Sequence, residues 1–195
     1  FIPKTLPGES GKFKILGRKK GVHFCSLLEL VTSSPERITP ECKHFAECNG
    51  CHFLHTDYDS EINYKLASFK RLLSRLNLDQ KTEINIIKSP SRHHYRNRVQ
   101  LHYSLKQNKI GFKANKGQNI NAVPGCIILD KSIQGEFDSV IQNWKSIIKQ
   151  QKLPAVGHVE IYNYKQEIKT SWNQAYAVDG FCLLYTSDAA DDSLR

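Results

Sequence analysis

The sequence contains no methionine, no long apolar run and no Gly-x-Gly motif. A membrane-spanning helix needs about 18 or more apolar residues, so the sequence predicts no membrane segment. The first residues lack the basic and apolar regions of a signal peptide, which favours a cytoplasmic protein. Without a Gly-x-Gly motif there is no basis for predicting a glycine-rich nucleotide loop. The missing initiator methionine leads us to expect that the chain begins inside a longer protein.

Acidic residues are the scarcer charge: 28 Lys and Arg stand against 19 Asp and Glu, and the formal net charge is +9. A basic balance supplies sequence-independent affinity for phosphate, so nucleic acid is the leading predicted partner. An anionic membrane surface would attract the same charge, but no predicted helix combines a basic side with a broad apolar face. The hydrophobic content of 39% is that of a folded globular protein.

The chain divides into segments of different character. Residues 182–195 break in composition with everything before them and resemble translated adapter sequence. We expect residues 179–195 to be a non-native tail and leave them out of the fold prediction. The rest is predicted to form an N-terminal β region (1–35), a cysteine loop with a helix (36–80) and an α+β body (81–178).

Hydrophobic periodicity predicts the secondary structure. Alternating apolar and polar residues indicate strands, and apolar residues three or four apart indicate helices. One helix is predicted to begin at the N-cap Asp59, and a second covers 136–151. The first helix should turn an apolar side toward the core, formed by Ile62, Leu66, Phe69, Leu72, Leu73 and Leu76. Strands are predicted at 12–16, 23–31, 99–105, 127–129, 158–164 and 167–172. The predicted class is α+β.

Three of the six cysteines, Cys42, Cys48 and Cys51, lie within ten residues. Cytosolic thiols stay reduced, so metal ligation is favoured over disulfides. The loop must be compact for three thiolates to converge, and Asn49-Gly50 supplies a residue that is free to take positive φ. The alternative is that these are buried free thiols, which pack as small hydrophobic groups. Random placement rarely concentrates three cysteines in this way.

A fourth ligand is needed, and Cys126 is the best candidate because Cys25 lies in a predicted strand and Cys182 in the excluded tail. Zinc and 4Fe-4S clusters both accept four cysteines. Paired Cys-x2-Cys knuckles are typical of zinc ribbons, whereas three close cysteines with one remote cysteine are commoner at 4Fe-4S clusters. The spacing therefore favours iron–sulfur over zinc. Nearby histidines are expected to be loop or surface residues rather than ligands: His44, His52 and His55.

Further motifs surround the cysteine loop. Four motifs come first in the chain: residues 33–42, His44-Phe45, Cys48-Asn49-Gly50-Cys51 and a helix with Lys65. Four more follow in the same order as in a known family: residues 89–90, 95–98, 110–112 and Cys126. Together they resemble the bacterial 23S rRNA (uracil-C5)-methyltransferase family, whose pattern is proline, Cys-x5-Cys-Gly-Gly-Cys, a Gln-His pair and a helix with a lysine. The resemblance covers most of residues 1–175. Asn49 departs from the usual glycine, and Phe53-Leu54-His55 replaces the usual Gln before His; Asn tolerates the left-handed region, so little harm is expected.

The resemblance implies three parts: a partial N-terminal TRAM barrel with an OB-like fold, a central α+β domain with a 4Fe-4S cluster on Cys42, Cys48, Cys51 and Cys126, and a C-terminal Rossmann-like methyltransferase domain. We expect that last domain, with its S-adenosylmethionine loop and catalytic cysteine, to be missing from this chain, so no catalytic residue is assigned and the chain alone should be inactive. The implied partner is 23S rRNA, because tRNA-directed relatives lack the cluster cysteines. A monomer is expected. The alternative is a non-catalytic nucleic-acid-binding module with a structural zinc site.

Basic and aromatic residues in two places are candidate RNA contacts. One is a basic turn in the predicted barrel, a type of fold that binds oligonucleotides. The other is the segment 92–98, whose guanidinium groups would contact phosphate while its tyrosine stacks on a base. An equally good alternative is that this segment anchors the central domain against the cysteine loop, with Arg96 near the sulfurs. The predicted RNA contacts are Lys19, Lys20, Arg92, Tyr95, Arg96 and Arg98.

Overall fold

The computed structural model describes residues 1–76, 83–114 and 119–173, so the expectation of a non-native tail at 179–195 lies outside the described residues. The N-terminal region is an antiparallel hairpin of β1 (Ser10–Lys19) and β2 (Val22–Thr32). Its two-residue turn has positive φ at Lys20 and Gly21, the conformation that matches strand twist in tight hairpins. Both predicted strands are confirmed; the larger barrel and the domain boundaries stay predictions.

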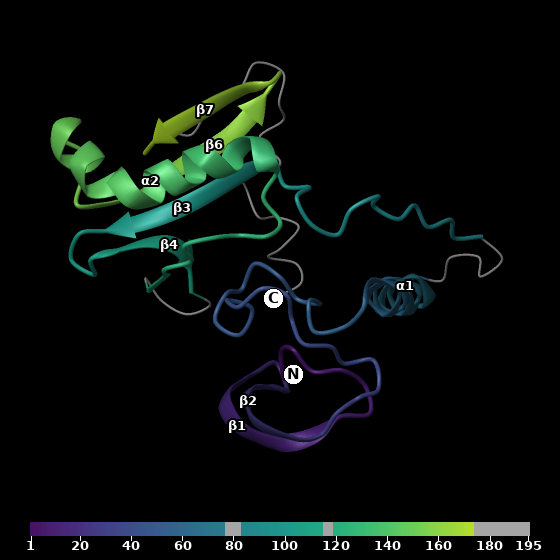
Figure 1. Cartoon of the computed structure of the whole chain (residues 1–195). Helices are drawn as coiled ribbons and strands as arrows, with labels where there is room; N and C mark the ends of the chain where they lie inside the picture. Colours follow the sequence, from purple (N-terminus) through teal and green to yellow (C-terminus); the bar gives the residue numbers. More distant parts are fainter. Residues whose placement is uncertain (77–82, 115–118, 174–195) are drawn as a thin grey trace.

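A five-stranded antiparallel sheet forms the largest unit, and α2 covers one of its faces (Figure 1). Each pairing joins strands that run in opposite directions. The strand order is β5-β4-β3-β6-β7. The bounds are β3 Arg98–Ser104, β4 Lys109–Lys113, β5 Ile120–Asn121, β6 Val156–Tyr164 and β7 Glu167–Trp172. The coarse prediction of a mixed helix-and-strand chain is confirmed.

The hydrophobic core lies between this sheet and α2 (Lys131–Gln150). The helix begins at 131 rather than at the predicted 136, because the Asp130 side chain accepts a hydrogen bond from the Ser132 amide at 2.8 Å and caps the helix. Burial of each large apolar side chain contributes about 1.5–3 kcal/mol. The fully or nearly buried set is Val99, Leu101, Tyr103, Ile110, Leu129, Ile133, Phe137, Val140, Trp144, Ile148, Val159 and Ile161.

The C-terminal hairpin of β6 and β7 matches its prediction closely. Lys165 and Gln166 join the strands, and their φ values of 50° and 69° define a two-residue turn with both central residues in the left-handed region. Tyr164 pairs with Glu167 across that turn. The period-two pattern and the short polar link were sufficient to place this hairpin.

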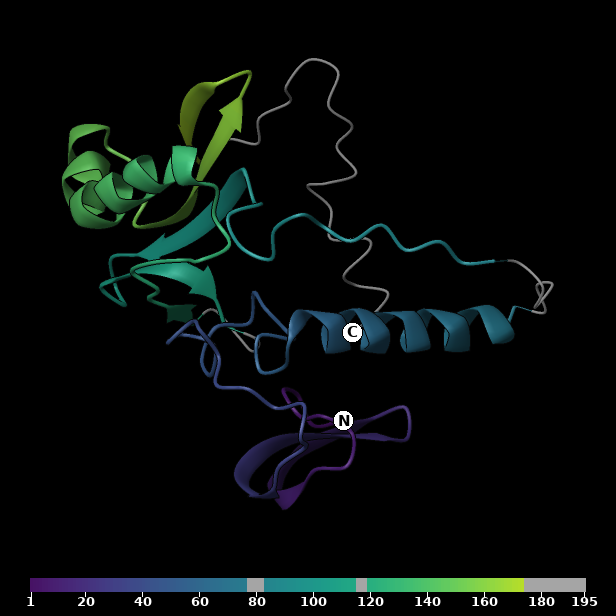
Figure 2. The same cartoon turned by 45° about the vertical axis from the view of Figure 1, so that its right-hand side comes forward.

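Helix α1 (Tyr58–Ser74) differs from its prediction in two ways. Its N-cap is Asp57, whose carboxylate accepts from the Ser60 amide at 2.8 Å, so the Asp59 assignment is wrong. The predicted core-facing side is also wrong: Ser60 is the only buried residue of α1, and Phe69 and Leu72 are 48% and 49% exposed. Figure 2 shows why, since α1 extends away from the sheet.

The predicted strand at 127–129 is wrong as well. Leu129 instead forms an isolated parallel bridge with Arg96. The Arg96 amide donates to the Ile128 carbonyl, and the Asp130 amide donates to the Arg96 carbonyl, each at 2.8 Å. This short pairing holds the segment around Cys126 beside the start of β3. Within the described ranges, no helix combines the length and apolarity that crossing a membrane requires.

Candidate metal centre

Tight turns fold the cysteine loop. The Phe45 amide donates to the Cys42 carbonyl at 3.0 Å, and the Cys48 amide donates to the His44 carbonyl at 2.7 Å. The Gly50 amide then points at the Cys48 Sγ, 3.4 Å away. The freedom of Asn49-Gly50 to take positive φ is not used, since neither residue is among those with positive φ. Local hydrogen bonds, rather than a left-handed residue, make this loop compact.

The four cysteines predicted as ligands share one neighbourhood. Burial, followed by the nearby thiols of Cys126, Cys48 and Cys42, raises the pKa of Cys51 to about 11. Burial likewise raises the pKa of Cys126, and Cys48 and Cys42 add to that shift. Electrostatic effects of this kind require proximity. The fold therefore brings Cys126 to the cysteine loop, although it lies 75 residues after Cys51.

Arg96 provides a positive charge at this centre, because it lowers the pKa of both Cys51 and Cys126 against the effect of burial. Thiolates are the metal-binding form of cysteine, and a bound cation replaces the thiol protons. Cys25 is buried in β2, and Cys182 lies outside the described residues. Within ranges 1–76, 83–114 and 119–173, no three His, Cys, Asp or Glu side chains are placed to hold a metal ion as they stand. Ligation stays a prediction.

His55 is a loop histidine, as expected, but it is buried rather than at the surface. It is 1% exposed, and its ring stacks on Phe45 with 5.3 Å between centroids. Burial, assisted by the positive charge of Arg37, lowers the pKa of His55. The stacking contact packs His55 against the cysteine loop through Phe45.

The Arg92 side chain binds other residues of this chain. Its Nη2 donates to the carbonyls of Phe53 and Thr56 at 2.9 and 2.7 Å, and it forms an ion pair with Glu61 at 3.0 Å. Both side chains of the pair are nearly buried, with 14% and 13% exposed. Arg92 therefore joins the end of the cysteine loop to α1, and its predicted RNA contact competes with this role.

Replacing Arg92 by alanine is expected to lower the free energy of unfolding by about 2 kcal/mol or more, because two carbonyls lose a donor and the nearly buried Glu61 carboxylate keeps only Lys65 as a cationic partner. Urea denaturation of the purified chain measures this change. The matched control is Lys88→Ala, which removes an exposed ion pair to Asp59 of α1 and should leave the free energy of unfolding almost unchanged. Equal stability of Arg92→Ala and wild type would contradict the structural role.

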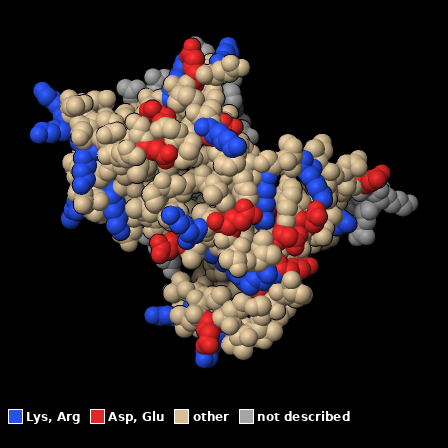
Figure 3. Space-filling view, viewed as in Figure 1, with Lys and Arg blue, Asp and Glu red and all other residues tan. Residues whose placement is uncertain are grey.

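The other predicted RNA contacts are placed as follows. Lys19 and Lys20 are exposed at the tip of the β1–β2 hairpin. Tyr95 is 56% exposed, which leaves its ring accessible. Arg98 donates through Nη2 to Glu160 Oε1 at 2.7 Å, so much of its charge is neutralised inside the sheet. Figure 3 shows basic side chains spread over the visible face with acidic ones between them, most densely near the end of α2.

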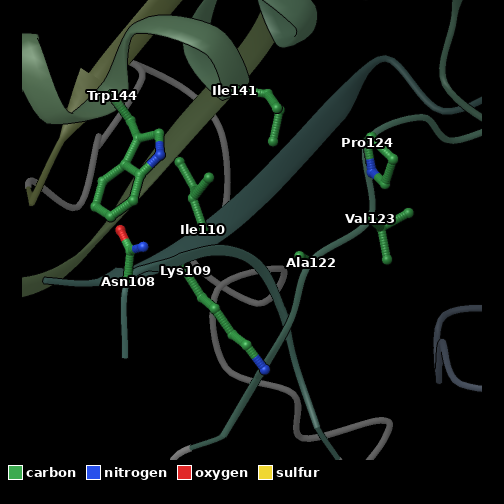
Figure 4. A pocket seen from close by; sticks show the side chains of 8 residues that line it. All are labelled: Asn108, Lys109, Ile110, Ala122, Val123, Pro124, Ile141 and Trp144. Carbon is green, nitrogen blue, oxygen red and sulfur yellow. The ribbon is translucent and has the colours of Figure 1, made fainter. Parts of the chain in front are cut away.

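A groove of about 280 Å³ lies between α2, β4 and the chain after β5 (Figure 4). Trp144 and Ile141 come from the helix, and Ile110 lines the opposite wall. Among the residues that the structure describes, Asn108 and Lys109 are the polar ones that line it. The remaining lining residues are Ala122, Val123 and Pro124.

Comparison with known proteins gives the family. No protein-family model matches the chain. The 23S rRNA (uracil(1939)-C(5))-methyltransferase of Shewanella frigidimarina is 27% identical over 168 residues, covering 83% of this chain and 36% of that protein. An uncharacterised RNA methyltransferase of Halalkalibacterium halodurans is 30% identical over 157 residues, covering 77% of this chain and 32% of that protein. The chain belongs to the RNA (uracil-C5)-methyltransferase family. It spans about a third of the length of the curated relatives it matches.

The methyltransferase relatives differ in the RNA that their names specify. The tRNA (uracil(54)-C(5))-methyltransferase of Pyrococcus abyssi is 28% identical over 168 residues, covering 86% of this chain and 37% of that protein. This is as close as the rRNA enzyme of Shewanella frigidimarina at 27%. Sequence identity therefore does not separate an rRNA target from a tRNA target.

Lys4 is a residue of the site that sequence reasoning missed. Its ammonium group donates to carbonyls of Phe45, Ala46 and Cys48. No local pattern marks a lysine for carbonyls more than forty residues away. Its φ of 62° is unusual for a residue with a side chain, but this too has no signature in the sequence.

Proposed function

We propose that this chain is the RNA-recognition and iron–sulfur portion of an S-adenosylmethionine-dependent 23S rRNA (uracil-C5)-methyltransferase. The match to curated RNA uracil methyltransferases over most of the chain carries the proposal. In the full-length enzyme, S-adenosylmethionine would supply the methyl group and uridine C5 in 23S rRNA would receive it. The residues for that transfer belong to a methyltransferase domain that we propose lies outside this chain.

The cysteine centre fits a 4Fe-4S cluster by its donor set. Such clusters take four cysteine thiolates, and Cys42, Cys48, Cys51 and Cys126 lie within electrostatic range of one another. When bound, the cluster would supply iron–thiolate bonds that join the loop to the remote segment at Cys126. Arg96 would offset part of the negative charge of the sulfurs. We propose a structural role, in which ligation energy becomes folding energy.

For RNA contact we propose the exposed tip of the N-terminal hairpin and the exposed ring of Tyr95. Replacing both Lys19 and Lys20 by alanine is expected to weaken RNA binding several-fold and to reduce its salt dependence, because two phosphate contacts are lost. Fluorescence anisotropy with a 23S rRNA fragment, measured at several salt concentrations, tests this. Lys145→Ala on α2 is the control and should change little. An unchanged salt slope in the double variant would remove the hairpin tip from the interface.

The choice of RNA needs its own test. We expect a uridine-containing 23S rRNA fragment to compete for the chain better than a tRNA transcript of similar length. For the chemistry, the longest product of this gene is incubated with unmodified 23S rRNA and S-adenosylmethionine, and 5-methyluridine is measured by mass spectrometry. Methylation of tRNA and not of rRNA would show that tRNA is the substrate. Methylation of neither RNA would contradict the proposed methyltransferase activity.

The alternative proposal, a non-catalytic nucleic-acid-binding module with a structural zinc site, uses the same four cysteines. Metal analysis separates the two. We expect anaerobically purified protein to be coloured and to contain iron and acid-labile sulfide. Colourless protein with one zinc per chain and no sulfide would favour the zinc module.

A further inference from the structure

We propose that Lys4 is a positioning residue for the cysteine loop and couples the N-terminal hairpin to ligation at Cys48. This inference rests on the metal ligation proposed above. It concerns the Lys4 network, defined as Lys4, Glu9, Arg37 and the loop carbonyls of residues 45–48.

The ammonium group of Lys4 donates all its hydrogen bonds to carbonyls of the cysteine loop. It donates to the Phe45 carbonyl, to the Ala46 carbonyl at 2.9 Å and to the Cys48 carbonyl at 3.0 Å. An ammonium group has three N–H donors, so all of them are occupied. The same group lies 4.8 Å from the centre of the Phe45 ring, within cation–π range.

The Glu47 carbonyl, which lies between those of Ala46 and Cys48 in the chain, is bound by another element. The Asn121 side-chain amide, at the end of β5, donates to the Glu47 carbonyl at 2.7 Å. Four successive carbonyls, 45 to 48, are thus bound by side chains from outside the loop. A loop that presents ligands must be held by its surroundings to keep its geometry before the metal arrives. Lys4 supplies three of these four contacts.

Lys4 is itself held rigidly. Its backbone is in the left-handed region, with φ of 62°, and its carbonyl accepts from Arg37 Nη2 at 3.0 Å. Arg37 also binds the Glu9 carboxylate through Nε and Nη2, in a bidentate pair. The amides of Leu6 and Ser34 donate to the same carboxylate at 2.8 and 3.2 Å. A lysine in the left-handed region is strained and persists where the surroundings hold it.

The Glu9 carboxylate is the centre of this support. Its side chain is 2% exposed, and the hydrogen bond from Arg37 lowers its pKa to about 2. The segment is also attached to β2, because the Cys25 amide donates to the Phe1 carbonyl at 2.8 Å. The hairpin, its preceding segment and the cysteine loop therefore share one hydrogen-bonded unit. Anything that orders the loop will also stabilise the docked hairpin, and the coupling is reciprocal.

The experiment compares Lys4→Met, Lys4→Arg and the control Lys12→Met, whose ion pair with Glu29 is exposed in the same hairpin. The protein is reconstituted anaerobically with ferrous iron and sulfide, and separately with zinc, and metal loss to a chelator is timed. We expect Lys4→Met to lose metal about tenfold faster than wild type, as changes around metal ligands commonly do. Lys4→Arg keeps a cation, so its rate of metal loss should lie between those of Lys4→Met and wild type. Lys12→Met should match wild type.

Amide hydrogen exchange supplies the second readout. In Lys4→Met the amides of Phe45 and Cys48 should exchange about tenfold faster, and metal should no longer slow exchange at Leu6 and Ser34. Wild-type rates of metal loss and exchange in Lys4→Met would overturn the proposal. If wild type binds neither iron–sulfur nor zinc, the proposed metal site fails by itself. Exchange at Phe45 and Cys48 in the metal-free protein then decides whether Lys4 positions the loop.

Discussion

Cys126→Ser is expected to abolish iron–sulfur incorporation and to remove the stabilisation that the metal gives. Cys126 is the ligand predicted outside the loop, and a neutral hydroxyl is a poor substitute for a thiolate. Without it, a cluster on Cys42, Cys48 and Cys51 would no longer tie the loop to the sheet. We expect iron and acid-labile sulfide per chain to fall at least about tenfold after anaerobic reconstitution, as for other losses of a metal contact.

Stability measurements separate ligation from packing at Cys126. The thiol is partly buried against the core cluster, so Cys126→Ser should cost the metal-free protein only about 1 kcal/mol. In the reconstituted protein the loss should be several-fold larger, because binding energy is folding energy. Thermal unfolding of both forms checks this difference. Cys25→Ala, at a buried thiol of β2, is the control. Cys25→Ala should destabilise the metal-free and reconstituted forms alike and leave the iron content unchanged. Full iron content in Cys126→Ser would instead remove Cys126 from the set of proposed ligands.

The parts of the fold that the sequence predicts well are those stabilised by short-range rules. The β6–β7 hairpin has an alternating pattern and a two-residue polar link, and both features act within about twenty residues. The core side of α2 follows from the spacing of Phe137, Val140 and Trp144. Its start was missed because Gly135 lies inside the first turns and apolar spacing alone does not reveal a cap at Asp130.

The failure at α1 has a different cause. Its apolar residues do recur at helical spacing, and the helix forms, but spacing cannot say whether another element covers that side. In the described structure Phe69, Leu72 and Leu76 are exposed. Periodicity thus predicts whether a segment is a helix or a strand more reliably than it predicts which other element packs against it.

The site shows the same division. Three close cysteines are visible in the sequence, and Cys126 could be chosen by elimination. The structural role of Arg92 could not be predicted in this way. An arginine that binds backbone carbonyls cannot be distinguished in a sequence from one that binds phosphate. The Lys4 network was also hidden, since Lys4, Glu9 and Arg37 meet only after the hairpin has folded.

Gly111→Ala is expected to lower the free energy of unfolding by about 3 kcal/mol or more, since overpacking against backbone cannot be relieved by a side-chain rotation. A Cβ at Gly111 would lie 2.0 Å from the Asn121 carbonyl oxygen and 2.9 Å from the Ala122 Cα. Gly111 also has φ of 159°, which side chains rarely adopt. Strands β4 and β5 would have to separate.

The matched control for Gly111→Ala is Gly135→Ala in α2, where a Cβ would meet nothing within 4 Å. That change should stabilise the chain by about 0.5–1 kcal/mol, because alanine is the better helix former. Because Asn121 also holds the Glu47 carbonyl, displacement of β5 in Gly111→Ala should loosen the cysteine loop and speed metal loss. Urea denaturation and chelator kinetics measure the two effects. Lower stability with unchanged metal retention would show that the sheet and the loop are not coupled through Asn121.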